Sequence, residues 1–245
     1  MFDGTKLPLS VWFEAMWLMT ITRKSLPHGF FADYFGISRD AAWRMAMRIR
    51  AHMAALCERG MLGGEGRIVF IDDTDFRCIT RRGYRKAHKA IVVAMWDGRR
   101  VVTEIVPRRR EEIMLQLVRR HVVKGSTIVS NGQSSFRSLG RSAYRDLRSL
   151  STGELAPELE RKARYLDAYW INIKKSLLGA HRHLGEKHLR FHIKEHELRH
   201  YFRGRPAEMF WEMVSNYPPL ALPGSLRARR YENGRRVEVP ETVSA

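Results

Sequence analysis

Residues 67–72 read RIVFID, an apolar run of β-branched residues that ends in the acid Asp72, and this run decides the fold. Three later runs have the same character: AIVVAMW at 90–96, RVVTEIV at 100–106 and STIVSN at 126–131. We expect all four runs to be strands, because β-branched residues suit a pleated and largely buried surface. The dipeptide Asp97-Gly98, between the second and third runs, predicts a tight antiparallel hairpin.

Segments with helical spacing of apolar residues follow the third and fourth strands. One of them, REEIMLQLVRRHVV at 110–123, crosses from the third strand to the fourth, which should place the fourth strand parallel to the first. Two more helices are expected at about 162–178 and about 186–202. The order of elements predicts an α/β fold in which a mixed sheet is flanked by helices.

The residues before the first strand predict a small all-helical region. Apolar residues at helical spacing between Pro8 and Arg23 indicate one buried helix. After it, Gly36 permits a tight turn and Ser38 can cap a following helix, which is the arrangement of a helix-turn-helix. The alternative is an ordinary helical hairpin with a solvated basic face.

Changes in composition divide the chain into regions. A glycine-rich hinge at 60–66 separates a helix-turn-helix DNA-binding region, residues 1–60, from an α/β domain at 67–205. The segment 218–245 is rich in arginine and turn-forming residues, and we expect a flexible basic tail there.

The chain is strongly basic. Its 245 residues carry 44 Lys and Arg against 26 Asp and Glu, a formal net charge of +18. A phosphate backbone neutralises such an excess with release of counterions, so double-stranded DNA is the expected partner. The alternative is a merely basic soluble protein. The two cysteines and the lack of a long apolar stretch predict a cytoplasmic, nucleoid-associated location with no membrane contact.

Three groups of cations are candidate DNA contacts. On the second helix of the helix-turn-helix, the side chains expected to project outward are Arg39, Arg44, Arg48 and Arg50. A basic loop after the first strand contributes Arg82, Arg85 and Lys86, and the edges of the two later helices contribute Lys175, Arg182 and Lys187. A solvated charged surface is the alternative for each group.

Polar side chains end two strands that should be neighbours. Asp72 ends the first strand and Asn131 the fourth, and the carboxyl ends of parallel strands meet at one edge of a sheet. Asp167, on the helix that follows, is the candidate third ligand of a site for two divalent cations. Oxygen ligands suit Mg²⁺ or Mn²⁺. The alternative for Asn131 is a plain Asn-Gly turn.

Most of the chain resembles the DDE-type insertion-sequence transposases of the ISXO-like group. The segments that carry the resemblance, in order, are TKLPLSVWF (5–13), AAWRMAMRIR (41–50), IVFIDDTDF (68–76), KAIVVAMWDGRRVV (89–102), GSTIVSNG (125–132), DAYWINIKKSLLGAHRHL (167–184) and KHLRFHIKEHELRHYFR (187–203).

The resemblance implies an RNase H-like catalytic domain that performs metal-dependent DNA strand cleavage and transfer for a bacterial insertion sequence. It implies that Asp72 is the first catalytic acid. Asp167-Ala168-Tyr169-Trp170 matches the family's acid, small, aromatic and Trp pattern, and Lys174 matches a later lysine. Because two DNA ends must be cut, we expect a homo-oligomer on DNA.

The sequence departs from the family within the site. Asn131 stands where the family has its second aspartate, Asp167 where glutamate is usual, and Arg164 where asparagine is usual. The family's N-terminal zinc ribbon has no counterpart in this sequence. Asparagine offers a metal one neutral oxygen and no negative charge, which should weaken metal binding.

Two neighbouring acids are candidates to replace the missing charge. Strand alternation sends Asp73 to the face opposite Asp72, so Asp75, expected on the loop beyond the strand, is the better substitute.

Two hypotheses of function follow. The chain is a working transposase with the variant triad Asp72, Asn131 and Asp167, or it is a catalytically impaired remnant or repurposed DNA-binding protein. A third possibility, a transcriptional regulator that uses only the helix-turn-helix, predicts that the residues after Gly66 are dispensable for DNA binding.

Other residues have structural interpretations. The helix at 186–202 carries histidines at four-residue intervals, and a basic stripe is favoured over a transition-metal site: His188, His192, His196 and His200. Glu195 and Arg199 predict a structural i, i+4 pair. Trp170 is expected to lie in the core rather than to stack on a base.

Overall fold

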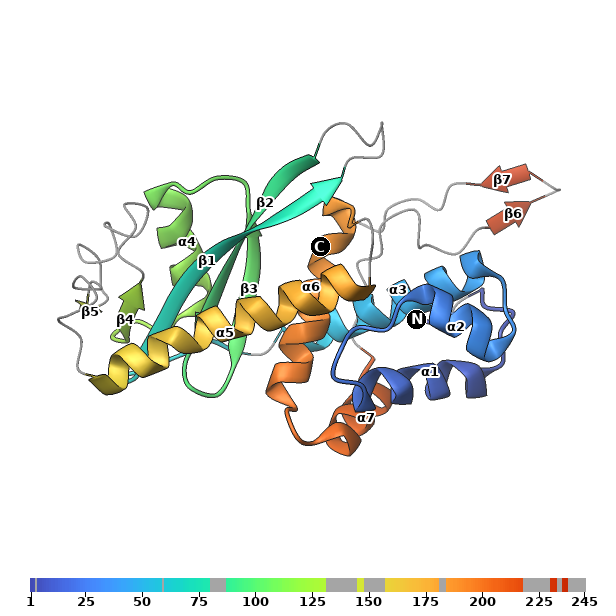
Figure 1. The fold of residues 1–245 in the computed structure, drawn as a ribbon, viewed down its shortest axis with the longest axis horizontal. Helices are drawn as coiled ribbons and strands as arrows, with labels where there is room; N and C mark the ends of the chain where they lie inside the picture. Colours follow the sequence, from blue (N-terminus) through green and yellow to red (C-terminus); the bar gives the residue numbers. More distant parts are fainter. Residues whose placement is uncertain are drawn as a thin grey trace.

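The protein is built on a five-stranded mixed sheet with the order β3-β2-β1-β4-β5 (Figure 1). β1 pairs parallel with β4, as expected, and antiparallel with β2, and β5 adds a second parallel pair. The strands are β1 (Ile68–Ile79), β2 (Ala87–Trp96), β3 (Val101–Val106), β4 (Thr127–Ser130) and β5 (Arg145–Leu147). This computed structural model describes residues 1–2, 4–58, 60–79, 87–130, 145–147, 157–180, 184–217, 230–232 and 235–237.

The turn between β2 and β3 is the hairpin that Asp97-Gly98 predicts. Gly98 has a φ of +93°, in the left-handed region that glycine adopts without steric cost. The Asp97 carboxylate accepts hydrogen bonds from the backbone N–H groups of Arg99 and Arg100, at 3.0 and 2.8 Å. These bonds hold the two strands in register up to the turn.

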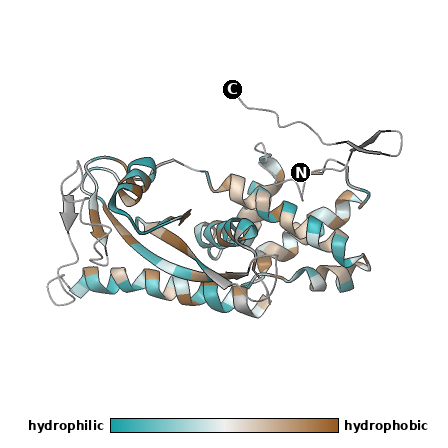
Figure 2. Ribbon diagram, turned by 90° about the horizontal axis from the view of Figure 1, so that it is seen from above, coloured by the Kyte–Doolittle hydropathy of each residue, from teal (hydrophilic) through white to brown (hydrophobic). Residues whose placement is uncertain are grey.

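Helices cover both faces of the sheet, which is the middle of three layers (Figure 2). Successive residues of β1 point to opposite faces, so Val69 and Ile71 pack toward α4 while Phe70 and Phe76 pack toward α5. The covering helices are α4 (Glu111–His121) on one face, and α5 (Pro157–Ala180) and α6 (Glu186–Tyr201) on the other.

A second group of helices lies beside the sheet, on the right in Figure 1: α1 (Leu9–Ile21), α2 (His28–Phe35), α3 (Arg39–Leu56) and α7 (Pro206–Ser215). α2 and α3 are two helices joined by a tight turn, a geometry common to a helix-turn-helix and to an ordinary helical hairpin. Gly36 makes the turn with a φ of +62°, and the Ser38 side chain caps α3 by accepting the N–H of Ala41 at 3.2 Å.

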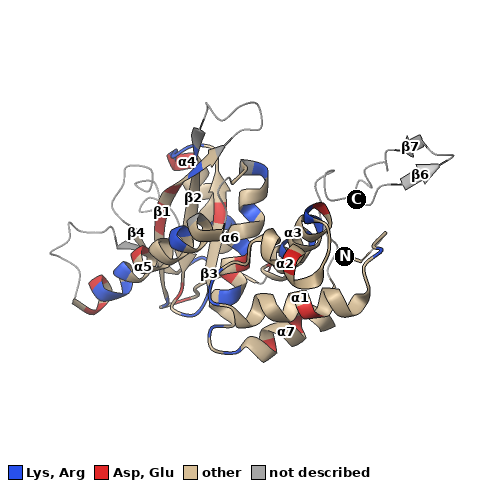
Figure 3. Ribbon diagram, turned by 45° about the vertical axis from the view of Figure 1, so that its right-hand side comes forward, with Lys and Arg blue, Asp and Glu red and all other residues tan. Residues whose placement is uncertain are grey.

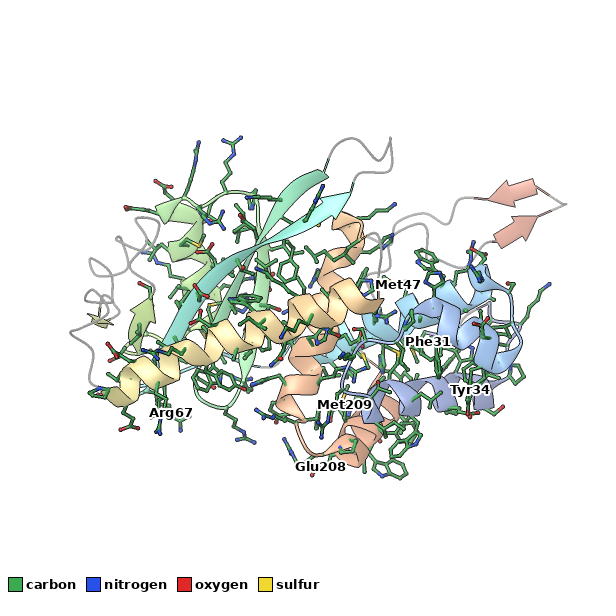
Figure 4. All side chains as sticks on the ribbon, in the orientation of Figure 1. Phe31, Tyr34, Met47, Arg67, Glu208 and Met209 are labelled. Atoms are coloured by element: carbon green, nitrogen blue, oxygen red, sulfur yellow. The ribbon has the colours of Figure 1, made fainter. Side chains whose placement is uncertain are left out.

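One hydrophobic core joins these helices to α6. Met16 of α1 and Phe31 of α2 share it with Leu198 of α6 and with Met209 and Met213 of α7. Figure 4 labels two of these side chains, Phe31 and Met209. We call α1, α2, α3, α7 and the C-terminal half of α6 the helical lobe. Residues 1–60 therefore supply only part of the core that the lobe encloses.

A buried ion network ties α3 to α6. The Arg50 guanidinium donates to Glu195 at 2.7 Å, and the two side chains are 1% and 0% exposed. Burial raises the pKa of Glu195, but the charges of Arg50 and Arg199 outweigh burial and hold it well below its ordinary value. The predicted Glu195–Arg199 pair is confirmed at 2.8 Å. Arg199 also donates to the backbone oxygen of Thr22, so the network reaches the end of α1.

A second buried network ties α6 to the sheet. Glu197 accepts hydrogen bonds from the backbone N–H and the hydroxyl of Thr103 in β3, at 2.9 and 2.6 Å. Lys194 pairs with the same carboxylate at 2.9 Å. α6 is thus fixed to β3 through Glu197 and to α3 through Glu195.

The expectation that Arg48 and Arg50 project outward is wrong. Arg48 is buried and donates to the backbone oxygen of Met1 at 3.2 Å, while Arg50 is held by Glu195. Arginines at these positions turn inward because the C-terminal part of α3 is enclosed by the rest of the helical lobe. Arg48 is therefore not a DNA contact in this conformation.

The helix α7 and the pair of strands β6 and β7 also differ from the expectation. α7 occupies a region for which no helix was predicted. Within the tail that was expected to be flexible, β6 (Arg230–Glu232) and β7 (Arg235–Val237) form an antiparallel pair. Among the described helices, none is both long enough and apolar enough to cross a bilayer.

Candidate active site

Asp72 lies in the middle of β1, where the pairing of that strand with β4 ends. Its neighbour Ile71 pairs with Ser130, the last residue of β4, and Asp72 itself pairs with Ala94 of β2. The prediction that Asp72 ends its strand is wrong, because β1 continues to Ile79 along the longer β2. Asp72 still stands at the carboxyl end of the parallel part of the sheet, and its side chain is half-buried.

Trp170 of α5 holds the carboxylate of Asp72. The indole nitrogen donates to Asp72 Oδ2 at 2.9 Å, while the ring packs in the core, edge-on to Phe76 with the ring centres 6.0 Å apart. The expectation that Trp170 is a core residue is confirmed, and its N–H gives it a second role. This contact fixes α5 against β1 at the level of the candidate catalytic acid.

Lys174 lies one helical turn beyond Trp170. Its ammonium donates to the Thr74 hydroxyl at 2.5 Å and sits 5.7 Å from the centre of the Phe76 ring. Thr74 follows Asp72 by two residues and therefore shares its face of the sheet. The structure thus brings Lys174, a predicted site residue, to the same face as Asp72.

Asp167 precedes Trp170 by three residues on α5 and is exposed. Residues three apart on a helix share one side of it, and three residues rise about 4.5 Å. Asp167 is therefore one helical turn from the contact between Trp170 and Asp72. The two described acids of the predicted triad come from facing elements, one from β1 and one from α5.

The acids expected to compensate for Asn131 lie on the other face of β1. Arg109 donates to Asp73 and to Asp75, at 2.6 Å each. Burial raises the pKa of Asp75, but the hydrogen bond and charge of Arg109 outweigh it and leave the pKa below its ordinary value. Asp75 is in the strand rather than on a loop and points away from Asp72, so the expectation that it substitutes for the missing charge is wrong.

The remaining predicted residues are only partly described. Arg39 is exposed at the first position of α3, and Arg44 is half-buried and paired with Asp40 at 2.8 Å. Lys175 and Lys187 are exposed. The predicted residues outside the described ranges are Asn131, Arg82, Arg85, Lys86 and Arg182.

His196 and His200 of α6 have side-chain hydrogen-bond partners within the fold. His196 Nε2 lies 3.3 Å from the Ser25 hydroxyl, and His200 Nε2 lies 2.6 Å from the Tyr165 hydroxyl. Burial is the main cause that lowers the pKa of each imidazole to about 4. They are partners in packing rather than a solvated basic stripe.

The donor chemistry of the site suits a divalent cation. Asp72 and Asp167 offer carboxylate oxygens, which Mg²⁺ and Mn²⁺ prefer. Within the described ranges, no three His, Cys, Asp or Glu side chains are grouped to hold a metal ion. The predicted third ligand, Asn131, is neither one of these residue types nor part of those ranges.

The strand order, with an acid on the central strand facing a long helix that carries the second acid, is that of an RNase H-like fold. The family model of the ISXO2-like transposase domain matches residues 64–200, which is more than half of the chain. The chain belongs to this family of transposases. No curated protein matches it.

Two solved structures are similar in part. One is the cryo-electron microscopy structure of the simian T-cell lymphotropic virus intasome in complex with PP2A regulatory subunit B56 gamma, at 11% identity and a TM-score of 0.37. That match covers 69% of this chain and 63% of the other, so the chain spans less than two thirds of that structure's length. The other is the Mos1 transposase paired-end complex with left transposon end, at 13% identity and a TM-score of 0.39, covering 87% and 81%.

Sequence reasoning missed two contacts of the site. The sequence does not single out Thr74 or the N–H of Trp170, because the apolar pattern ends the strand at Asp72 and the indole is expected only to pack in the core. The two-residue alternation of a strand, extended beyond Asp72, places Thr74 and Phe76 on the face of the sheet that α5 covers. This alternation is the sequence signal for both contacts.

Proposed function

We propose that this chain is the transposase of a bacterial insertion sequence, which binds the element ends and carries out metal-dependent DNA strand cleavage and transfer. One observation carries the proposal: the hydrogen bond from Trp170 to Asp72 brings the side of α5 that bears Asp167 to the acid of β1. Membership of a transposase family supports the same reaction class.

The site residues have distinct roles in this proposal. Asp72, Asp167 and the amide oxygen of Asn131 would hold Mg²⁺ or Mn²⁺. The bound metal would activate water or a 3′-hydroxyl and stabilise the leaving oxygen. Trp170 orients the Asp72 carboxylate, and Lys174 places a positive charge beside it, where a DNA phosphate would sit.

DNA binding is assigned to cations on two sides of the molecule. Arg39 and Arg44 at the start of α3 would enter a groove, and Lys175 and Lys187 would contact phosphates near the site. The proposal includes Arg82, Arg85, Lys86 and Arg182 from the sequence. We expect the protein to act as a homo-oligomer on double-stranded DNA, at the nucleoid.

Asn131 favours a second candidate function. Without the second carboxylate the site carries one negative charge less than the family's, and metal affinity depends on that charge. A DNA-binding protein that has lost strand cleavage would keep the basic surface and the buried networks of α6.

A nicking and strand-transfer assay separates the two functions. Purified chain is incubated with the DNA ends that flank its gene, in Mg²⁺ and in Mn²⁺, beside the Asp72→Ala and Asn131→Asp variants. The transposase predicts product from the unsubstituted chain, none from Asp72→Ala and more from Asn131→Asp. Binding without product in either metal would contradict it and leave the second candidate.

The Asn131→Asp variant also tests the placement of position 131. If that position is a metal ligand, the added carboxylate should tighten Mn²⁺ binding measured by calorimetry, whether or not the unsubstituted chain is active. Unchanged Mn²⁺ affinity would remove position 131 from the proposed site.

A further inference from the structure

α1 and α7 present an exposed apolar surface on the helical lobe. We call Trp17 and Ile21 of α1 with Phe210 and Trp211 of α7 the aromatic face. Trp211 is 65% exposed, Ile21 45% and Trp17 39%. The rings form a continuous group, because Phe210 lies 5.5 Å from Trp17 and 6.2 Å from Trp211 between ring centres.

The aromatic face has the composition of an interface centre. Exposed tryptophans that sit together, rather than singly, mark interaction sites, and tryptophan is enriched among the residues that dominate binding energy. Nothing in the helical lobe needs this exposure for folding, since the buried sides of α1 and α7 already fill the core.

The charges of the two helices argue against DNA as the occupant. α1 and α7 contain no lysine or arginine, and their only charged residues are Glu14, Glu208 and Glu212 (Figure 3). A phosphate backbone would meet the carboxylates of these helices, and Arg205, the cation at the start of α7, is already paired with Glu208, although the chain as a whole has a net charge of +18.

The same charges favour a second copy of this chain. Two molecules of charge +18 repel each other over most of their surfaces, and this repulsion is weakest where helices without cations meet. Carboxylates of these helices already have partners within the same molecule: Glu14 accepts a hydrogen bond from Tyr34 at 2.7 Å, and Glu208 pairs with Arg205 at 2.6 Å. Apolar faces can pair with themselves, which suits the two-fold symmetry of most homodimers.

We propose that two copies of the chain associate through their aromatic faces, α1 and α7 of one against α1 and α7 of the other, without DNA. The proposed function expects an oligomer on DNA; this inference adds the surface, and it requires neither metal nor catalysis. The two proposals can therefore fail separately.

Sedimentation velocity on the full chain tests the proposal. Nucleic acid is removed with nuclease, and the buffer contains about 0.5 M salt, which suppresses bridging by residual DNA but not apolar contact. The unsubstituted chain should form dimers at concentrations up to about 100 µM, because interfaces of ordinary size bind with micromolar or tighter affinity. A chain that stays monomeric over that range would overturn the proposal.

Substitutions locate the contact. Trp211→Glu should raise the dimer dissociation constant about 30-fold or more, the effect expected of a central tryptophan. The matched control is Met61→Glu, which places the same charge at a 44% exposed apolar residue outside the aromatic face and should leave the dimer intact. Dimers that survive Trp211→Glu, or that Met61→Glu disrupts equally, would show that another surface is used.

A second, uncharged substitution at position 211 separates loss of the interface from loss of the fold. Trp211 is largely exposed, so Trp211→Ser should keep the circular dichroism spectrum and melting temperature of the unsubstituted chain while weakening the dimer. If both variants at position 211 are folded and dimeric, the aromatic face is not the interface.

Discussion

Trp170 acts on the candidate site through a single hydrogen bond, which makes its contribution separable from its packing. Trp170→Phe removes the donor to Asp72 Oδ2 and keeps an aromatic ring in the core. If the chain is an active transposase, we expect nicking to slow at least about tenfold while the free energy of unfolding falls by about 1–3 kcal/mol. The rate and the denaturation curve are measured on the same preparation.

The control for this variant lies on the same helix. Tyr165→Phe removes a hydroxyl that is 2.6 Å from His200, away from Asp72, and keeps the ring stacked on Trp96. It should lower stability without slowing nicking. Equal loss of activity in both variants would show that Trp170 acts through stability alone.

At the scale of single residues, what the sequence predicts depends on how far away the partner is. Asp72 and Asp167 were selected as site residues from local motifs. The inward direction of Arg50 was missed, because its partner Glu195 is 145 positions away and an arginine on a helix is usually solvated. The bond between Trp170 and Asp72 spans 98 positions, and the sequence does not predict it because Trp170 is expected only to pack in the core.

Among the elements, α6 buries several charged and imidazole side chains in its middle. Its buried histidines make the stability of the protein depend on pH. His196 has a pKa of about 4 in the folded chain and about 6.5 when unfolded, mainly because of burial. Between these values the unfolded chain binds a proton that the folded chain does not, so stability is lost as pH falls. The loss is up to about 1.4 kcal/mol per pH unit for each such histidine.

Replacing the imidazole tests this dependence. We expect His196→Gln to flatten the plot of unfolding free energy against pH between about 6.5 and about 4, by up to about 1.4 kcal/mol per unit. Ser25→Ala removes the hydroxyl that contacts His196 and keeps the imidazole, so its slope should match that of the unsubstituted chain. Parallel slopes for all three chains would contradict the assignment.

The sequence predicted the type and order of most elements and failed mainly in their lengths. The hairpin and the parallel β4 were predicted from Asp97-Gly98 and from the crossover helix, which are local signals. β1 was predicted too short because its polar residues after Asp72 break the apolar pattern, although pairing with β2 keeps them in the strand. α7 was not predicted, because the helix is only 10 residues long, begins with a proline and lies between segments rich in turn-forming residues.

For the whole molecule, the shared core of the helical lobe predicts that the helix-turn-helix does not fold alone. A fragment of residues 1–60 lacks Leu198, Phe202 and α7, and it buries Arg50 without Glu195. We expect this fragment to show no cooperative thermal transition, measured by circular dichroism. A chain of residues 1–217 keeps every one of these contacts and should melt cooperatively.

The same fragment tests the hypothesis that the protein is a transcriptional regulator. A protein that used only the helix-turn-helix would bind DNA without the residues after Gly66. If residues 1–60 fold and bind DNA as tightly as the full chain, the helical lobe is not the unit described above.

The closing of the helical lobe by α6 and α7 has a consequence during synthesis. α1, α2 and α3 leave the ribosome first, yet Leu198 and Met209, which complete their core, are translated near the end of the chain. The apolar surface of the first helices therefore stays unburied while the sheet is translated, and during that time chaperones can bind it. An incomplete translation product would lack Leu198 and Met209 and would therefore leave the apolar side of α1, α2 and α3 uncovered.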